Sequence, residues 1–185
     1  MCQISASILS ANFAYLAGDV QAMLSAGVDT IHFDVMDFHY VPNLSMGPMV
    51  CQSLRDAGIT APIDVHLMVE NPEKYIEPFA KAGASIVTFH PETTGNVFEL
   101  LQKIQQMGMQ AGLVFNPDQS VLIDAAWSDY IDIVLLMSVY PGFGGQSFIP
   151  DVLDKIRSTR DFLDQNSSRA RLAVDGGVKV DNAAG

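Results

Sequence analysis

The chain has 185 residues and a formal net charge of −11, from 10 basic and 21 acidic side chains. Hydrophobic residues make up 49% and charged residues 17%, which excludes a disordered chain and suggests one domain over residues 1–185. The excess of acidic residues argues against a protein that binds nucleic acid or an anionic membrane, because the negative electrostatic potential of the protein repels both. No apolar run reaches the roughly 18 residues of a membrane span and no signal peptide is visible, so we expect a cytoplasmic protein.

Short apolar runs rich in β-branched residues alternate with longer segments of helical periodicity. Strands are predicted at residues 4–9, 30–35, 62–68, 86–90, 111–116, 131–138 and 171–175. Helices are predicted between them, at 13–26, 48–57, 72–82, 97–107, 121–127 and 152–163. Glycines are expected to end the first four helices, and Asn71 is expected to be the N-cap of the third.

This alternation predicts parallel strands with helices outside, which fits a doubly wound open sheet or a (β/α)8 barrel. A dinucleotide-binding open sheet carries G-x-G-x-x-G after its first strand, but residues 10–13 read Ser-Ala-Asn-Phe. We therefore expect an α/β fold of the TIM-barrel type. A complete barrel takes about 250 residues. With seven strands and six helices, the barrel is expected to be C-terminally incomplete, lacking helix 7, strand 8 and helix 8, as in a truncated sequence or part of a longer chain.

Polar side chains lie at the ends of the predicted strands, and in a barrel the carboxyl ends of the strands build the active site. Residues two apart share one face of a strand, so His32 and Asp34 lie together, as do Asp64 and His66. If these faces point inward, Asp175 of the seventh strand joins them. Two imidazoles and two carboxylates form a candidate site for Zn²⁺, Fe²⁺, Mn²⁺ or Co²⁺. Asp64 is expected to lie deeper and to be structural.

Three further polar residues have less certain places in this scheme. His90 and Asn116 also end strands, and the sequence leaves open whether they are structural or belong to the site. His39 follows the second strand and is expected in a loop or at the rim.

Two glycine clusters follow the sixth and seventh strands, at residues 142–145 and 176–177. Glycine runs allow backbone N–H groups to approach an anion and also allow a loop to hinge. Barrel enzymes frequently bind phosphate with the loops after strands seven and eight. The two clusters together with the candidate metal site therefore favour a phosphate ligand, although a plain mobile turn explains the first cluster alone equally well.

Taken in order, these motifs resemble the ribulose-phosphate 3-epimerase family. The resemblance runs essentially end to end and rests on SILSA at 7–11, HFDVMD at 32–37, VPNL at 41–44, DVHLM at 64–68, MSV at 137–139, PGFGGQ at 141–146 and VDGGV at 174–178. It implies an isomerase that interconverts D-ribulose 5-phosphate and D-xylulose 5-phosphate in the pentose phosphate pathway or Calvin cycle.

The resemblance also implies roles for the matching residues. One divalent metal ion would be held by His32, Asp34, His66 and Asp175. The two aspartates would be the catalytic acid and base, exchanging protons on opposite faces of a metal-stabilised cis-enediolate. The residues expected to contact the substrate are Ser7, His66, Met36, Met68, Met137, Gly142, Phe143, Gly144, Gly145, Gly176 and Gly177. The expected partners are a small sugar phosphate and further copies of the chain in a homo-oligomer.

Other barrel enzymes fit less well. An enzyme resembling orotidine-phosphate decarboxylase needs D-x-K-x-x-D, but the segment from Asp34 to Asp37 holds no lysine. A Schiff-base aldolase needs a lysine at a strand end, and every lysine here falls in a helical or loop segment. An epimerase for a hexulose phosphate such as D-allulose 6-phosphate stays open, as does an inactive truncated fragment.

Overall fold

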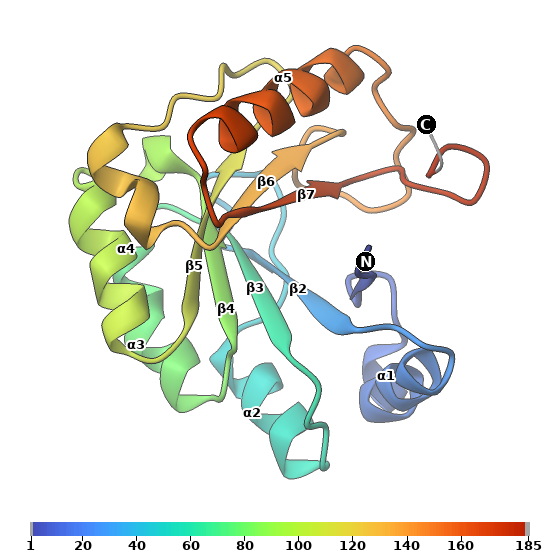
Figure 1. The fold of residues 1–185 in the computed structure, drawn as a ribbon. Coiled ribbons are helices and arrows are strands. Elements are labelled where there is room, and N and C mark those ends of the chain that lie inside the picture. The colour runs from blue at the N-terminus through green and yellow to red at the C-terminus, as the bar shows by residue number, and fades with distance from the viewer. Residues whose placement is uncertain (1, 184–185) are drawn as a thin grey trace.

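The computed structural model describes residues 2–183 and contains one curled sheet of seven parallel strands (Figure 1). Each strand pairs with the next one along the chain. A doubly wound sheet would reverse its strand order, so this sequential order confirms the barrel prediction. The strands are β1 (Ser5–Ser7), β2 (Thr30–Met36), β3 (Ile63–Met68), β4 (Ile86–Phe89), β5 (Gln110–Phe115), β6 (Ile133–Met137) and β7 (Arg171–Asp175).

The helices lie on the outer side of the sheet (Figure 1). The α-helices are α1 (Leu16–Ser25), α2 (Pro48–Asp56), α3 (Glu73–Lys81), α4 (Val97–Gln106) and α5 (Val152–Gln165). Three short 3-10 helices, η1 (Phe13–Tyr15), η2 (Pro91–Thr93) and η3 (Ala125–Tyr130), complete the set. Among residues 2–183, no helix is both long enough and apolar enough to cross a membrane.

Two sequence predictions about helices were wrong. The helix expected at 121–127 is the 3-10 helix η3, which begins later because the Asp124 side chain accepts the N–H of Ala126 and caps it there. The preceding residues Val121 and Ile123 pack their side chains against the core from an irregular segment. Asn71 is not the N-cap of α3, because it adopts a left-handed backbone with φ of 53° and Pro72 takes the cap position.

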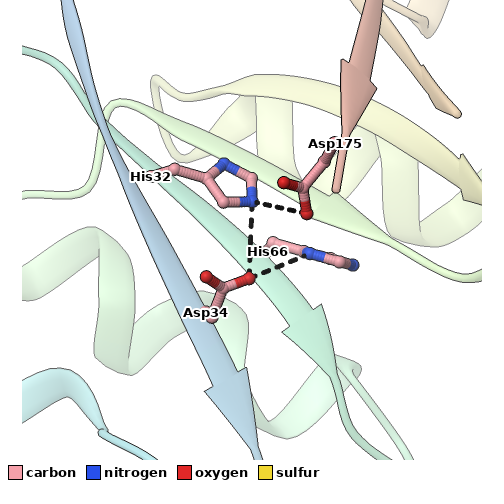
Figure 2. A group of neighbouring side chains, drawn as sticks. All are labelled: His32, Asp34, His66 and Asp175. Atoms are coloured by element: carbon pink, nitrogen blue, oxygen red, sulfur yellow. Dashed lines mark ion pairs between the residues drawn. The ribbon is translucent and has the colours of Figure 1, made fainter. Parts of the chain in front are cut away.

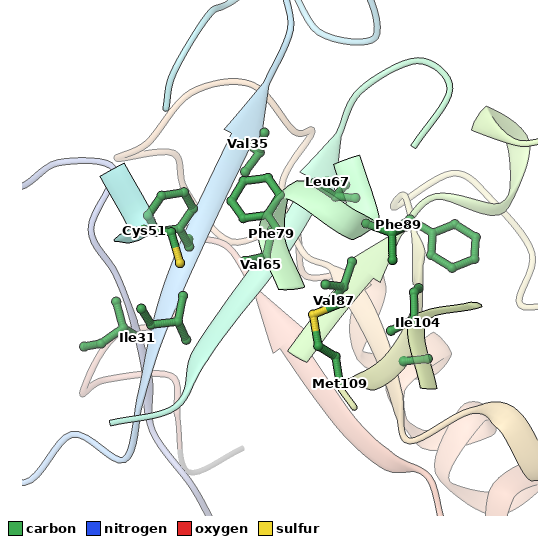
Figure 3. Close-up of a cluster of buried hydrophobic side chains, with 14 of the residues drawn as sticks. Ile31, Val35, Cys51, Val65, Leu67, Phe79, Val87, Phe89, Ile104 and Met109 are labelled. Atoms are coloured by element: carbon green, nitrogen blue, oxygen red, sulfur yellow. The ribbon is translucent and has the colours of Figure 1, made fainter. Parts of the chain in front are cut away.

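The main hydrophobic core lies between the sheet and the helices (Figure 3). Ile31 and Val35 of β2 and Val65 and Leu67 of β3 point into it and meet Phe79 of α3. Full burial of one such side chain stabilises the fold by about 1.5–3 kcal/mol. Because successive side chains of a strand alternate between its faces, this packing turns the even-numbered residues of β2 and β3 toward the barrel interior.

The strands β1 and β7 are the two ends of the sheet and do not pair with each other within residues 2–183. A side-chain hydrogen bond of 2.6 Å from Arg171 of β7 to Gln3 links the segments at their amino ends. After β7, residues 176–183 form turns and no further helix or strand. The described residues therefore hold seven of the eight strands of a (β/α)8 barrel, as the sequence predicted.

Candidate active site

Four side chains from three strands converge inside the barrel: His32 and Asp34 of β2, His66 of β3 and Asp175 of β7 (Figure 2). One nitrogen or oxygen atom from each lies within 4.8 Å of the others. Asp34 Oδ1 is 3.5 Å from His32 Nε2 and 3.4 Å from His66 Nδ1. His32 Nε2 is also 3.7 Å from Asp175 Oδ2. The structure thus brings together the four residues that the sequence grouped.

The geometry and chemistry of this cluster fit a divalent metal ion. His32 Nε2 and His66 Nδ1 are buried and have no hydrogen-bond partner within the described chain. Two atoms that each bind a tetrahedral ion at about 2.1 Å lie roughly 3.4 Å apart, close to the separations found here. Imidazole nitrogens and carboxylate oxygens together suit Zn²⁺, Fe²⁺, Mn²⁺ or Co²⁺. This set of donor atoms suits all four ions and does not select one of them.

The histidines and carboxylates of the cluster also shift one another's protonation. Burial lowers the pKa of His32, but the carboxylates of Asp34 and Asp64 outweigh it and raise that pKa well above its usual value. Burial raises the pKa of Asp34, but His32 and His66 outweigh it and hold that pKa well below its usual range. Asp34 therefore stays ionised, as both a metal ligand and a general base require.

Asp64 orients one of the candidate ligands. Its Oδ2 lies 3.0 Å from Nδ1 of His32, which stands directly opposite in the register of β2 and β3. A carboxylate only accepts, so Nδ1 of His32 keeps its proton, and Nε2 is the nitrogen that can lose a proton and offer a lone pair to a metal ion. Asp64 is hydrogen-bonded inside the barrel, as expected. Its contact with His32 also orients a candidate metal ligand, which the sequence did not indicate.

The residues that the sequence left open lie behind the cluster. His90 is fully buried, and its Nε2 is 3.1 Å from Nε2 of His66. Burial and the adjacent His66 hold the pKa of His90 well below its usual value, so its imidazole is neutral. Asn116 donates a 2.7 Å hydrogen bond to the hydroxyl of Tyr40, whose ring packs beside His90. His39 is exposed at the rim, as predicted.

A cavity of about 850 Å³ lies in front of the cluster, between β1 and β7 and under the loops that follow β6 and β7. Asp34 and Asp175 both line it, and no lysine does within the described chain. The residues expected to contact the substrate also line this cavity, with the exception of His66: Ser7, Met36, Met68, Met137, Gly142, Phe143, Gly144, Gly145, Gly176 and Gly177. Their roles toward a substrate stay predictions.

The two glycine loops that line this cavity have backbone N–H groups that are unpaired within the described chain. No backbone N–H of residues 142–146 or 176–178 donates a hydrogen bond to a group within residues 2–183. Gly177 has a φ of +66°, and a Cβ there would lie 2.3 Å from the backbone nitrogen of Phe148. Only glycine therefore allows the loop after β7 to approach the loop after β6 this closely. Clustered free N–H groups are a common feature of anion-binding loops.

Solved structures of other proteins share the fold at low sequence identity. KGPDC from Streptococcus mutans is 15% identical, with a TM-score of 0.68 over 98% of this chain and 81% of that one. Phosphoribosyl anthranilate isomerase from Thermotoga maritima is also 15% identical, with a TM-score of 0.62 over 98% of this chain and 80% of that one. These similarities support the barrel fold alone.

Sequence relatives are far closer. The chain matches the model of the ribulose-phosphate 3 epimerase family over residues 3–185. It is 56% identical to a ribulose-phosphate 3-epimerase of Serratia marcescens, over 98% of this chain and 86% of that protein. It is 57% identical to the ribulose-phosphate 3-epimerase of Escherichia coli (strain K12), over 97% of this chain and 80% of that protein. The chain therefore belongs to the ribulose-phosphate 3-epimerase family of isomerases.

Proposed function

We propose that this isomerase interconverts D-ribulose 5-phosphate and D-xylulose 5-phosphate by proton transfer at carbon 3, with a divalent metal ion as cofactor. The family and the names of its relatives support the substrate. The single observation that carries the mechanism is the convergence of Asp34 and Asp175, from β2 and β7, on one cavity beside two buried histidines.

Two carboxylates are what this reaction needs. Carbon 3 lies next to the carbon-2 ketone, so loss of its proton leaves an enediolate. Inversion requires one group to remove the proton from one face and another to return a proton to the opposite face. Asp34 and Asp175 come from strands far apart in the sheet order, and both carboxylates line the same cavity. Acid–base help of this kind accelerates a reaction by about 10²–10⁴-fold.

The Asp34 carboxylate is held in place by its neighbours. The Ser7 hydroxyl donates a 2.6 Å hydrogen bond to its Oδ2, while its Oδ1 faces the two histidines. Asp175 is less enclosed, since its side chain is 29% exposed against 7% for Asp34. We therefore assign Asp34 as the more firmly held carboxylate of the pair.

His32, Asp34, His66 and Asp175 are proposed to hold the metal ion. When bound, such an ion acts as a Lewis acid that stabilises negative charge on the substrate oxygens. Asp64 supports this role by keeping the His32 proton on Nδ1, away from the site.

The rest of the cavity is proposed to shield the enediolate and to bind the phosphate. Met36, Met68 and Met137 are buried apolar side chains that line it, and they would exclude water from the reacting carbon. The free N–H groups of residues 142–146 and 176–178 would bind the phosphate oxygens. Backbone N–H groups can bind a phosphate dianion without basic side chains, which suits a protein with a net charge of −11. The homo-oligomer and the cytoplasmic location stay predictions.

A conversion assay tests this proposal. The purified chain is loaded in turn with Zn²⁺, Fe²⁺, Mn²⁺ and Co²⁺ and incubated with D-ribulose 5-phosphate or D-allulose 6-phosphate, and the products are followed by ¹³C NMR. Conversion of the pentose phosphate by at least one metal-loaded form, and not by the metal-free protein, supports the proposal. Conversion of the hexulose phosphate alone would mean that the proposed pentose substrate is wrong. No conversion of either sugar phosphate would contradict the proposal that this chain is an active epimerase.

A further inference from the structure

A side-chain hydrogen bond joins the loop after β2 to the glycine loop after β6. The side-chain amide of Asn43 donates to the backbone oxygen of Gly142 at 2.7 Å. Asn43 is itself held on its own loop, since its Oδ1 accepts the N–H of Leu44 at 2.9 Å and its backbone oxygen accepts the N–H of Phe38 at 2.9 Å. These contacts fix the orientation of the amide, so that its nitrogen is the end that faces Gly142.

Gln146 binds two further carbonyl groups of the same glycine loop. Its side-chain amide nitrogen donates to the backbone oxygen of Tyr140 at 2.7 Å and to that of Phe143 at 2.8 Å. By contrast, no backbone N–H of residues 142–146 donates to a group within residues 2–183. The loop thus has three carbonyl groups bound by side-chain amides while its N–H groups stay free, which is the arrangement expected where a loop binds an anion and not a cation.

Two of these bonds also fix the direction of particular N–H groups. A peptide unit is planar and trans, so the C=O of one residue and the N–H of the next point to opposite sides. The bond to the Gly142 oxygen therefore turns the N–H of Phe143 away from Asn43. In the same way, the bond to the Phe143 oxygen turns the N–H of Gly144 away from Gln146. Phe143 and Gly144 both line the cavity in front of the carboxylates.

We propose that Asn43 and Gln146 are positioning residues of the phosphate site, which hold two peptide units so that the N–H groups of Phe143 and Gly144 face the phosphate. This inference rests on the proposed role of the glycine loops. Glycine adopts positive and negative φ with similar ease, so peptide units in such a loop rotate readily. Rotation would replace an N–H with a carbonyl oxygen, which repels an anion. Without the two amides, phosphate binding would have to order the loop, at a cost in affinity.

Asn43→Leu and Gln146→Met test this role, because they nearly keep the size of the side chain, add no charge and remove the donors. Asn166→Leu and Gln52→Met are the matched controls. The Asn166 amide donates a 2.8 Å hydrogen bond to the backbone oxygen of Phe162, and the Gln52 amide donates one of 2.8 Å to Asp56. Both control residues are exposed and lie outside the cavity. A general effect of losing a side-chain hydrogen bond would therefore appear in the controls as well.

The first readout is the affinity for inorganic phosphate, measured by calorimetric titration at about pH 8, where the ion is mainly a dianion. The protein is metal-free, so that phosphate cannot bind to a metal ion instead. We expect the dissociation constant to rise about 3- to 10-fold in Asn43→Leu and in Gln146→Met, as the loss of one hydrogen bond implies. In the two controls it should stay close to that of the unmodified chain.

The second readout is the backbone amide signals of Phe143 and Gly144 in ¹H–¹⁵N NMR spectra during the same titration. We expect both signals to move downfield as phosphate binds to the unmodified chain and to the controls. At equal saturation, the Phe143 signal should move less in Asn43→Leu and the Gly144 signal less in Gln146→Met. A residue that only stabilises the fold would not change which N–H groups respond to phosphate.

Unchanged phosphate affinity in the folded loop variants, no response of the Phe143 and Gly144 signals, or no phosphate binding by the unmodified chain would overturn the proposal. If one loop variant does not fold, the other decides the matter through the same measurements, and the amide signals of the unmodified chain need no variant. Neither readout depends on turnover. A chain that shows these effects without epimerising ribulose 5-phosphate would contradict the proposed function alone, whereas an active chain with unchanged affinities would contradict this inference alone.

Discussion

The hydroxyl of Ser7 donates a 2.6 Å hydrogen bond to Oδ2 of Asp34, which ties the edge strand β1 to the proposed catalytic carboxylate on β2. The bond leaves Oδ1 of Asp34 facing the histidines, 3.4 Å from Nδ1 of His66. One oxygen of the carboxylate is thus fixed by Ser7, and the other faces the histidines of the candidate metal site. These two sets of contacts orient the Asp34 carboxylate in the cavity.

Ser7→Ala should lower kcat without changing metal content, because the carboxylate loses one of its anchors. A hydrogen bond to a charged group contributes about 1.5–3 kcal/mol, so we expect a decrease of roughly 10- to 100-fold if the bond is fully formed in the transition state. Steady-state kinetics with metal analysis measures this. Ser5→Ala, two residues earlier on the same strand, is the control, and equal kinetics of the two variants would refute the role of Ser7.

Replacement of Asp64 should weaken metal binding in a graded way. Asp64→Asn keeps an acceptor for His32 Nδ1 but loses the charge, whereas Asp64→Leu loses both. We expect metal affinity to fall about 10-fold in the first and toward 100-fold in the second. Chelator competition measures the affinity. Thr30→Val changes another buried polar residue of β2 and should leave it unchanged. Equal metal affinity of Asp64→Leu and Thr30→Val would mean that Asp64 has a purely structural role.

Gly177→Ala should impair phosphate binding. The added Cβ would lie 2.3 Å from the backbone nitrogen of Phe148, so one of the two glycine loops has to move. Misplacement of about 1 Å in a site can cost roughly 10²-fold in activity, and we expect most of the loss in KM. Gly108→Ala is the control, because Gly108 has a similar φ of +81° but open space around it. A KM for Gly177→Ala no higher than that of Gly108→Ala would contradict the phosphate assignment.

Asp37 should stabilise the fold at neutral pH and lose this effect in acid. Burial raises the pKa of Asp37, but the N–H groups of Glu70, His39 and Tyr40 outweigh it and hold that pKa below its ordinary value of 3.8. A carboxylate whose folded pKa is depressed stabilises the fold fully above the unfolded value and progressively less as pH falls through the folded one.

Asp37→Asn should therefore lower the free energy of unfolding by about 1–3 kcal/mol at pH 7. The difference from the unmodified chain should persist down to about pH 4 and shrink below it. Urea unfolding of the metal-free proteins across pH 3–7 measures this. Asp56→Asn, at an exposed position of α2, should change stability by less than about 0.5 kcal/mol. A pH-independent difference for Asp37→Asn would show that the charge of this carboxyl group is not the cause.

Much of the fold was predictable because its pattern is local. Strands of a parallel barrel are buried on both faces, so β6 appears in the sequence as a short apolar run, and β2 and β3 appear as apolar residues alternating with a few polar ones. The side-chain period of two is enough to place His32, Asp34 and Met36 on one face of β2. The two wrong helix predictions concern residues that favour either a turn or a helix cap. Asn71 adopts a left-handed turn conformation, whereas Asp124 caps the helix η3.

The contacts behind the candidate ligands were not predictable from the sequence. The His32–Asp64 pair depends on the register of two strands, and the His66–His90 pair joins strand ends 24 residues apart. Tyr40 reaches His90 only because the loop after β2 folds over the carboxyl end of the sheet. The polar strand ends were visible in the sequence, but which of them face each other is set by barrel geometry.

Deuterium exchange at carbon 3 tests the central claim most directly. The metal-loaded chain is incubated with D-ribulose 5-phosphate in D₂O, and the sugar phosphates are examined by ¹H and ¹³C NMR beside an Asp34→Asn control. We predict that both epimers accumulate with one deuterium at carbon 3, and that Asp34→Asn slows this by at least about 10²-fold. Absence of deuterium at carbon 3, or its appearance at carbon 1 instead, would contradict the proposed reaction.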